Sequence, residues 1–144
     1  MYHKSLAIFE KEPNSDPDES VVVFEITLSN LKSRGEIDEE DFMDRARLLC
    51  SLGQTVMISN FKEYYRLAEY FSDYTEKKIR LTMGVNNLIE IFNEKYYGNL
   101  SGGILEAFGK LFFKNLKVYL YPIIDPKNGN ITDSNSLRVH PRLK

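Results

Sequence analysis

One carboxyl group stands inside a stretch of sequence that otherwise predicts a buried strand. Glu25 lies within residues 21–28, whose side chains are mostly β-branched or apolar. Burying an unpaired charge is costly, so Glu25 must lie near the end of the strand, be paired, or have a raised pKa. A perturbed carboxyl group of this kind is a candidate catalytic residue. The alternative is a structural role, with Arg66 or Arg80 as its partner.

Small polar residues follow the predicted strands where helices are expected to begin. The candidate ligand-binding residues are Thr27, Ser59, Asn60, Lys62, Gly84 and Asn86. In parallel sheets ligands bind beyond the carboxyl ends of the strands, where backbone amides at helix N-termini attract phosphate or carboxylate groups. Lys62 adds a positive charge, and Gly84 lets the backbone approach a ligand closely. Alternatively, Ser59 or Asn60, and Asn86, are ordinary helix N-caps with nothing bound.

The remaining side chains of types that commonly perform catalysis do not form a recognisable catalytic or metal-binding pattern in the sequence. His3 and His140 are the only histidines, so we expect neither a Ser-His-Asp triad nor a histidine-based zinc site, and we predict no metal site. The sequence contains no phosphate-binding P-loop and no glycine-rich dinucleotide fingerprint, which leaves the cofactor unknown. The single Cys50 lies in an apolar helical run, which predicts a buried and inert thiol.

Four apolar segments predict strands, and amphipathic segments lie between them. The strands are expected at residues 21–28, 55–59, 78–83 and 117–121, and the helices from 38 to 53, from 61, over 87–97 and over 104–113. This alternation requires right-handed crossovers and a parallel sheet. We therefore predict a three-layer α/β fold, Rossmann-like or haloacid-dehalogenase-like, with a mostly parallel sheet of about four strands and flanking helices.

The two ends of the chain depart from this pattern. Residues 1–20 combine a short amphipathic helix with a linker that holds two prolines. Residues 21–125 are expected to form the α/β domain, and residues 126–144 to form an irregular tail.

Composition and charge exclude some partners. The chain is 42% hydrophobic and 28% charged, with a formal net charge of −2. Nucleic-acid binders usually carry a basic excess, so we expect no nucleic-acid partner. The sequence has no signal peptide and no apolar run long enough to cross a bilayer, so we expect a cytoplasmic protein without a membrane partner. The oligomeric state stays open.

The order of two segments resembles the haloacid dehalogenase superfamily of phosphatases. Members of that superfamily have one strand ending in Asp-x-Asp and a second strand ending in Ser or Thr. Residues 24–27 and 58–59 share this layout, but Glu25 and Thr27 replace the two aspartates. The resemblance implies a degenerate phosphatase in which the usual nucleophile is replaced.

A longer set of segments resembles an uncharacterised family of bacterial proteins. The matching segments are 24–31, 34–38, 58–61, 63–67, 83–85, 87–88, 94–97 and 102–109. Members carry the labels TonB-dependent receptor or nicotinate-nucleotide adenylyltransferase, but the His-x-Gly-His motif of the latter does not occur in this sequence. The resemblance implies an α/β fold and a longer parent protein of which this chain is a fragment, and it transfers no catalytic residue.

Three functional hypotheses follow from these patterns. The leading one is a cytosolic domain that binds a small phosphorylated or nucleotide-like ligand at the carboxyl edge of the sheet. The second is an interaction or scaffold domain of a larger protein, without a small ligand. The third is the degenerate phosphatase, with Glu25 as its candidate catalytic group.

Overall fold

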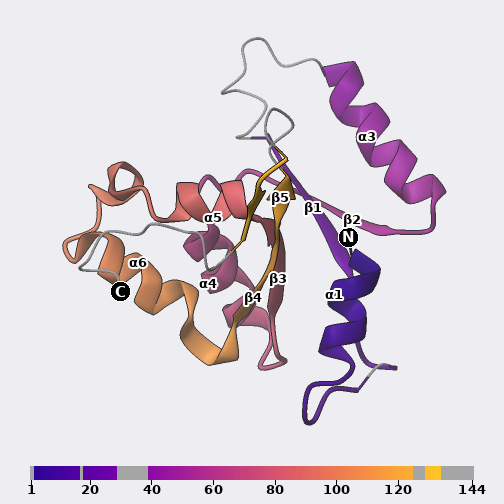
Figure 1. Cartoon of the computed structure of the whole chain (residues 1–144), viewed down its shortest axis with the longest axis horizontal. Coiled ribbons are helices and arrows are strands. Elements are labelled where there is room, and N and C mark those ends of the chain that lie inside the picture. Colours follow the sequence, from indigo (N-terminus) through magenta and orange to yellow (C-terminus); the bar gives the residue numbers. More distant parts are fainter. Residues whose placement is uncertain (1, 17, 29–38, 125–128, 134–144) are drawn as a thin grey trace. The chain divides into compact units, whose positions relative to one another are not determined.

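The computed structural model describes residues 2–16, 18–28, 39–124 and 129–133 (Figure 1). The chain divides into two compact units. The larger unit comprises Met1–Pro13 and Glu63–Lys144, and the smaller unit comprises Asn14–Lys62. Each unit is described by itself.

The smaller unit contains two parallel strands and one helix. Strand β1 (Val23–Thr27) pairs with strand β2 (Thr55–Ser59), and helix α3 (Glu39–Ser51) lies between them in sequence. Gly53 adopts a positive φ of 73° in the turn before β2, a conformation that favours glycine. The buried hydrophobic residues among the described positions of this unit are Phe42 and Ala46.

The larger unit contains most of the secondary structure. Its elements are α1 (Tyr2–Phe9), α4 (Tyr64–Tyr74), β3 (Arg80–Gly84), α5 (Val85–Ile91), the 3₁₀ helix η1 (Glu94–Tyr97), α6 (Gly103–Leu111), the 3₁₀ helix η2 (Phe113–Asn115), β4 (Lys117–Tyr121), β5 (Ile123–Ile124) and β6 (Ile131–Thr132). Strands β3 and β4 are parallel, with Arg80 opposite Lys117 and Gly84 opposite Tyr121. Strands β5 and β6 are antiparallel.

The hydrophobic core lies in the larger unit. Its buried members are Tyr65, Ala68, Met83, Ile91, Tyr97, Ile104, Ala107, Leu111 and Leu116. Leu111 and Val85 are the largest side chains that are almost completely buried among the described residues. Full burial of a side chain of this size contributes about 1.5–3 kcal/mol, so this core is the main source of stability for the elements around it.

The mixed α/β class that the sequence predicts is confirmed. Among the described residues, however, the long strands form two separate two-stranded parallel sheets, so a single sheet of four strands is not confirmed. Residue 38, where the first of the predicted helices between strands begins, and the last residues of the expected tail, 134–144, lie outside the described residues.

In each of two pairs of adjacent tyrosines one side chain is buried: Tyr65 and Tyr97 are buried, Tyr64 is half-buried and Tyr96 is exposed. The prediction of a buried thiol is wrong, because Cys50 is exposed. The apolar run around Cys50 covers more of the α3 surface than the small sheet can bury, and Leu48 beside it is 61% exposed.

Candidate functional site

Three of the predicted site residues meet at the carboxyl end of the β1–β2 pair. Thr27 and Ser59 are opposite each other in the register. Glu25 lies two residues before Thr27, and alternate residues of a strand share a face. The Ser59 hydroxyl donates a hydrogen bond to Oε1 of Glu25, and Ser59 is only 8% exposed. The partner of Glu25 is therefore a serine on the neighbouring strand, and neither arginine suggested by the sequence.

The turn after β2 uses the hydroxyl groups of this cluster. The Thr27 hydroxyl donates to the carbonyl oxygen of Phe61 at 3.0 Å, and the Phe61 amide donates to Oγ of Ser59 at 3.3 Å. Helix α4 begins at Tyr64 rather than Phe61, and its N-cap residue, Glu63, makes no side-chain cap hydrogen bond. The prediction that Ser59 or Asn60 caps this helix is wrong, because the Ser59 hydroxyl closes a turn before the helix starts.

The other predicted site residues are not part of the hydrogen-bonded cluster of Glu25, Thr27 and Ser59. Asn60 and Lys62 are exposed. In the larger unit, Gly84 ends β3 and is itself the N-cap residue of α5, with no side-chain cap hydrogen bond, so the prediction that Asn86 caps this helix is wrong. Asn86 is exposed in the first turn. A Cβ atom on Gly84 would meet Ile123 Cδ1 at 3.9 Å, an ordinary contact.

The Glu25–Ser59 pair limits what this cluster can do chemically. The serine proton is held by the carboxylate, and both the serine and threonine hydroxyls have partners within the unit. A group that approaches Glu25 must bring its own hydrogen-bond donor, such as a hydroxyl or an amine, because an ionised carboxylate only accepts. A phosphate group would be repelled here and would require the exposed Lys62.

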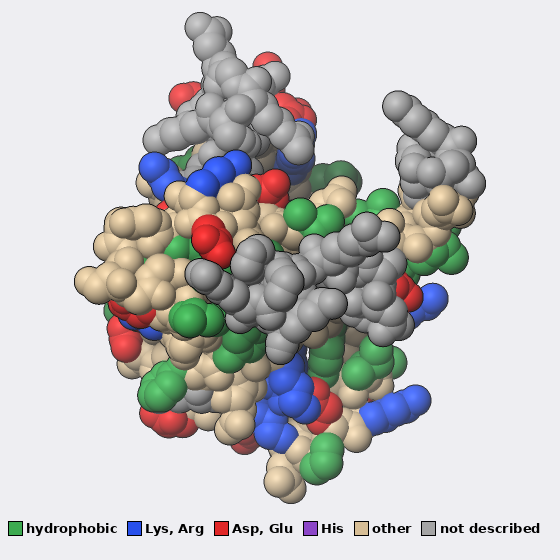
Figure 2. All heavy atoms as spheres, turned by 60° about the vertical axis from the view of Figure 1, so that its left-hand side comes forward, with side chains coloured by type: hydrophobic (Ala, Val, Ile, Leu, Met, Phe, Trp, Pro, Cys, Tyr) green, Lys and Arg blue, Asp and Glu red, His purple; other side chains and the backbone are tan. Residues whose placement is uncertain are grey.

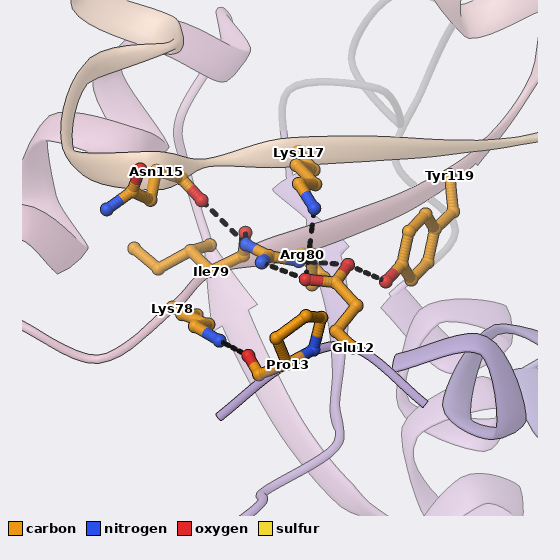
Figure 3. Close-up of polar contacts among 8 residues, drawn as sticks. All are labelled: Glu12, Pro13, Lys78, Ile79, Arg80, Asn115, Lys117 and Tyr119. Atoms are coloured by element: carbon orange, nitrogen blue, oxygen red, sulfur yellow. Dashed lines mark hydrogen bonds and ion pairs between the residues drawn. The ribbon is translucent and has the colours of Figure 1, made fainter. Parts of the chain in front are cut away.

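A second polar cluster, which the sequence hypotheses did not include, lies at the amino ends of β3 and β4 (Figure 3). Nε of Arg80 donates to Oε1 of Glu12 at 2.9 Å, and Nη2 of Arg80 donates to Oε2. Nζ of Lys117 lies 3.1 Å from Oε2, and the Tyr119 hydroxyl donates to Oε1. The side chains of Arg80 and Glu12 are 8% and 11% exposed. We call these four residues the Glu12 cluster.

The electrostatics of the Glu12 cluster follow from its hydrogen bonds. The bonds from Arg80 and then Tyr119 hold the pKa of Glu12 well below its ordinary value. The bond to Glu12 raises the pKa of Arg80 above its already high value. Burial, and next the bond to Glu12, raises the pKa of Tyr119. All three groups therefore keep their charge states at neutral pH, with Glu12 ionised and Tyr119 neutral.

A signal for this cluster is present in the sequence. Strands β3 and β4 both begin with a basic residue, Arg80 and Lys117, and parallel pairing brings the first residues of the two strands together. Tyr119 shares a face with Lys117 because it lies two residues farther along the strand. The contribution of Glu12 was not predictable, because it comes from a segment far away in the sequence.

In the part of the chain that the structure describes, no helix is long and apolar enough to cross a membrane, and no three His, Cys, Asp or Glu residues are grouped so that they could hold a metal ion. Comparison of the chain with protein-family models, with curated proteins and with solved structures gives no match.

Proposed function

We propose that this chain is a protein-interaction domain and that the outer face of α6 binds a second copy of the chain. The observation that carries the proposal is the sequence of α6, GILEAFGKL, which is apolar on two faces. An amphipathic surface helix normally turns its apolar stripe toward the core. In α6 the inner face is buried, whereas the outer face contacts the core only through the half-buried Phe108.

The two faces differ sharply in exposure. On the inner face, Ile104, Ala107 and Leu111 are 8%, 1% and 2% exposed. On the outer face, Leu105 is 66% exposed, and Phe112, the residue that follows the helix, is 47% exposed. Contiguous exposed apolar side chains of this size are typical of interaction sites.

Aromatic contacts hold the outer face together. Phe108 lies between Leu105 and Phe112 in sequence, and its ring is in edge contact with Phe112 at a centroid distance of 6.0 Å and with Phe92 at 5.2 Å. The spacing of Leu105, Phe108 and Phe112 is i, i+3 and i+7, which is the anchor pattern of helices that bind in grooves. Figure 2 shows exposed hydrophobic side chains in several groups on one face of the molecule.

The position of Gly109 favours a second copy of the chain as the partner that binds the outer face of α6. Gly109 lies between Leu105 and Phe112 on this face, and a Cβ atom there would have no neighbour within 4 Å. Two α6 helices that cross at Gly109 can approach closely and place Leu105 of each copy against Phe112 of the other. Such reciprocal contacts are the pattern of a two-fold symmetric interface.

Sedimentation velocity over a range of concentrations tests the proposal. We expect the wild-type chain to form a dimer and Leu105→Glu to be monomeric, because the new charge would be buried at the interface. Leu52→Glu is the matched control, since Leu52 is 64% exposed and lies outside α6. A monomeric wild-type chain, or equal dissociation of both variants, would overturn the proposal.

A second candidate function is supported by the convergence of Glu25, Thr27 and Ser59 at one strand end. In this proposal the chain is a cytoplasmic, Rossmann-like three-layer domain that binds a nucleotide-like ligand. The ligand hydroxyls would contact Glu25, and its phosphate would contact Lys62. Calorimetric titration with AMP tests this: we expect binding that is weakened at least about tenfold in Glu25→Gln, a change of about 1.4 kcal/mol. Equal binding by both proteins, or none by the wild type, would contradict it.

The third hypothesis, a degenerate phosphatase, rests on the same carboxyl group. It requires slow magnesium-dependent hydrolysis of a phosphate ester that is lost in Glu25→Gln. Hydrolysis that does not depend on magnesium would count against this hypothesis.

A further inference from the structure

The Glu12 cluster resembles a ligand site in which the ligand belongs to the protein. Two cationic side chains and one hydroxyl group converge on a single carboxylate, and each carboxylate oxygen has two partners. The guanidinium of Arg80 contacts Glu12 in the two-pronged geometry that arginine uses to bind carboxylate and phosphate groups. The charges of Arg80, Lys117 and Glu12 sum to +1, so a more highly charged anion would be favoured over a carboxylate.

Arg80 is held in place independently of Glu12. Its Nη1 donates to the carbonyl oxygen of Asn115 at 2.6 Å and to that of Ile79 at 2.8 Å. These two carbonyl groups belong to the segments that begin β4 and β3, as Figure 3 shows. The remaining donors, Nε and Nη2, therefore stay aimed at the same point when Glu12 is absent. Preorganisation of Arg80 in this way lowers the cost of ordering the site around a ligand.

Glu12 itself belongs to a segment with few buried groups. In α1, which precedes it, Ser5 is the residue that is buried, and Ile8 is 54% exposed. Further contacts of the segment are a hydrogen bond from Ser5 Oγ to the Tyr121 hydroxyl at 3.4 Å, a hydrogen bond from Lys78 to the carbonyl oxygen of Pro13 and a cation–π contact of Arg80 with Phe9 at 5.7 Å. Segments with few buried apolar contacts open at low free-energy cost. The side chain of Lys117, 59% exposed, leaves one side of the cluster open to solvent.

We propose that Arg80, Lys117 and Tyr119 form an oxyanion-binding site that Glu12 occupies as an internal ligand, so that residues 2–13 control access to it. The external ligand is a compact phosphate or carboxylate group. It binds when the N-terminal segment withdraws, and it competes with Glu12 for the same donors. The site lies at the amino ends of β3 and β4, whereas the ligand site that the sequence suggests lies at carboxyl ends.

Calorimetric titration of the full chain with inorganic phosphate, and separately with acetate, tests the proposal. We expect Glu12→Ala to bind phosphate at least about tenfold more tightly than the wild type does, because the internal competitor is removed. Glu10→Ala removes an exposed carboxyl group from the same segment and should bind phosphate as the wild type does. Adding Arg80→Met to Glu12→Ala should abolish binding. Tighter binding of acetate alone would identify a carboxylate ligand instead.

A folded Glu12→Ala protein that binds neither anion more tightly than the wild type would overturn the proposal, as would binding that survives Arg80→Met. If Glu12→Ala does not fold, amide hydrogen exchange of the wild type gives the answer. Phosphate should speed exchange in residues 2–13 relative to chloride at the same ionic strength, because it displaces Glu12. Unchanged exchange would then refute the competition.

Discussion

The hydroxyl group of Tyr97 shows how one buried polar atom is satisfied in the core of the larger unit. Tyr97 is 5% exposed, and its hydroxyl donates to the carbonyl oxygen of Ile91 at 2.6 Å. Burial, and next the charge of Glu63, raises the pKa of Tyr97 to about 12 from an ordinary value of 10.0. The neutral hydroxyl is therefore part of the folded state.

Replacing Tyr97 by Phe should lower the free energy of unfolding by about 1 kcal/mol at neutral pH, since the Ile91 carbonyl group loses its donor. The raised pKa of Tyr97 also has a pH consequence. An unfolded chain releases the proton near pH 10, but the folded chain keeps it until about pH 12, so the wild type loses stability as the pH rises through this interval. Tyr97→Phe should lose less over the same interval.

Urea unfolding at a series of pH values measures both effects. Tyr96→Phe is the control, because Tyr96 is 41% exposed and its hydroxyl donates to Glu90 at the surface. Its removal should change the stability by less than about 0.5 kcal/mol. Equal losses in the two variants would show that the bond to Ile91 contributes nothing specific.

Among individual residues, the sequence predicted the polar cluster around Glu25 but did not predict the contribution of Glu12 to the Glu12 cluster. Glu25 was conspicuous because a charged side chain interrupted an apolar run, and Ser59 followed because it ends the neighbouring strand, opposite Thr27. Glu12 gave no comparable signal, since an acidic residue in a linker is usually solvated. The partners that hold its side chain, Arg80, Lys117 and Tyr119, all lie far away in the sequence.

The start of α6 shows how one residue type decides an element boundary. Gly102, the N-cap residue, has an amide that donates to Oε2 of Glu106 at 2.9 Å, and this bond lowers the pKa of Glu106. A Cβ atom on Gly102 would lie 2.9 Å from Cβ of Glu106. Neither atom is at the free end of a flexible side chain, so the backbone would have to shift.

Gly102→Ala should therefore destabilise the chain by about 1–3 kcal/mol, the usual cost of overpacking. Gly98→Ala is the matched control, because Gly98 has a negative φ of −62° and a Cβ atom there would have no neighbour within 4 Å. That change should be neutral or stabilising by about 0.4–1 kcal/mol. Thermal unfolding of both variants checks the prediction, and a stable Gly102→Ala protein would contradict it.

Element types were easier to predict from the sequence than element boundaries and pairings. Strands β2 and β4 begin and end at the residues that the apolar runs indicate. Helix α4 starts at Tyr64, three residues later than expected, because Ser59 and Thr27 hold residue Phe61 in a turn. The sequence of α6 has apolar residues at the positions of both faces, but the exposure of each face depends on which elements pack against the helix.

The two units of the whole molecule differ in how much apolar surface they bury. The hydrophobic core cluster lies in the larger unit. In the smaller unit the buried hydrophobic residues among the described positions are Phe42 and Ala46, while Leu48, Leu52 and Ile58 are at least half exposed. Apolar segments predict both parallel pairs equally well, because a sequence pattern does not report how much neighbouring structure covers a strand.

This difference predicts that the two parallel pairs open at different free-energy costs. Two-stranded pairs without a substantial core are marginal by themselves, and regions with few buried apolar contacts exchange amide hydrogens through low-energy openings. Amides of β1 and β2 should therefore exchange about tenfold or more faster than those of β3 and β4, a difference of about 1.4 kcal/mol in opening free energy. Native-state hydrogen exchange followed by mass spectrometry measures both pairs in one sample.

Two matched variants test the same difference. Leu111→Ala, which creates a cavity in the core, should speed exchange in β3 and β4, and Phe42→Ala should speed exchange in β1 and β2. Equal protection of the two pairs in the wild type would show that the smaller unit gains its stability from contacts other than those of Phe42 and Ala46.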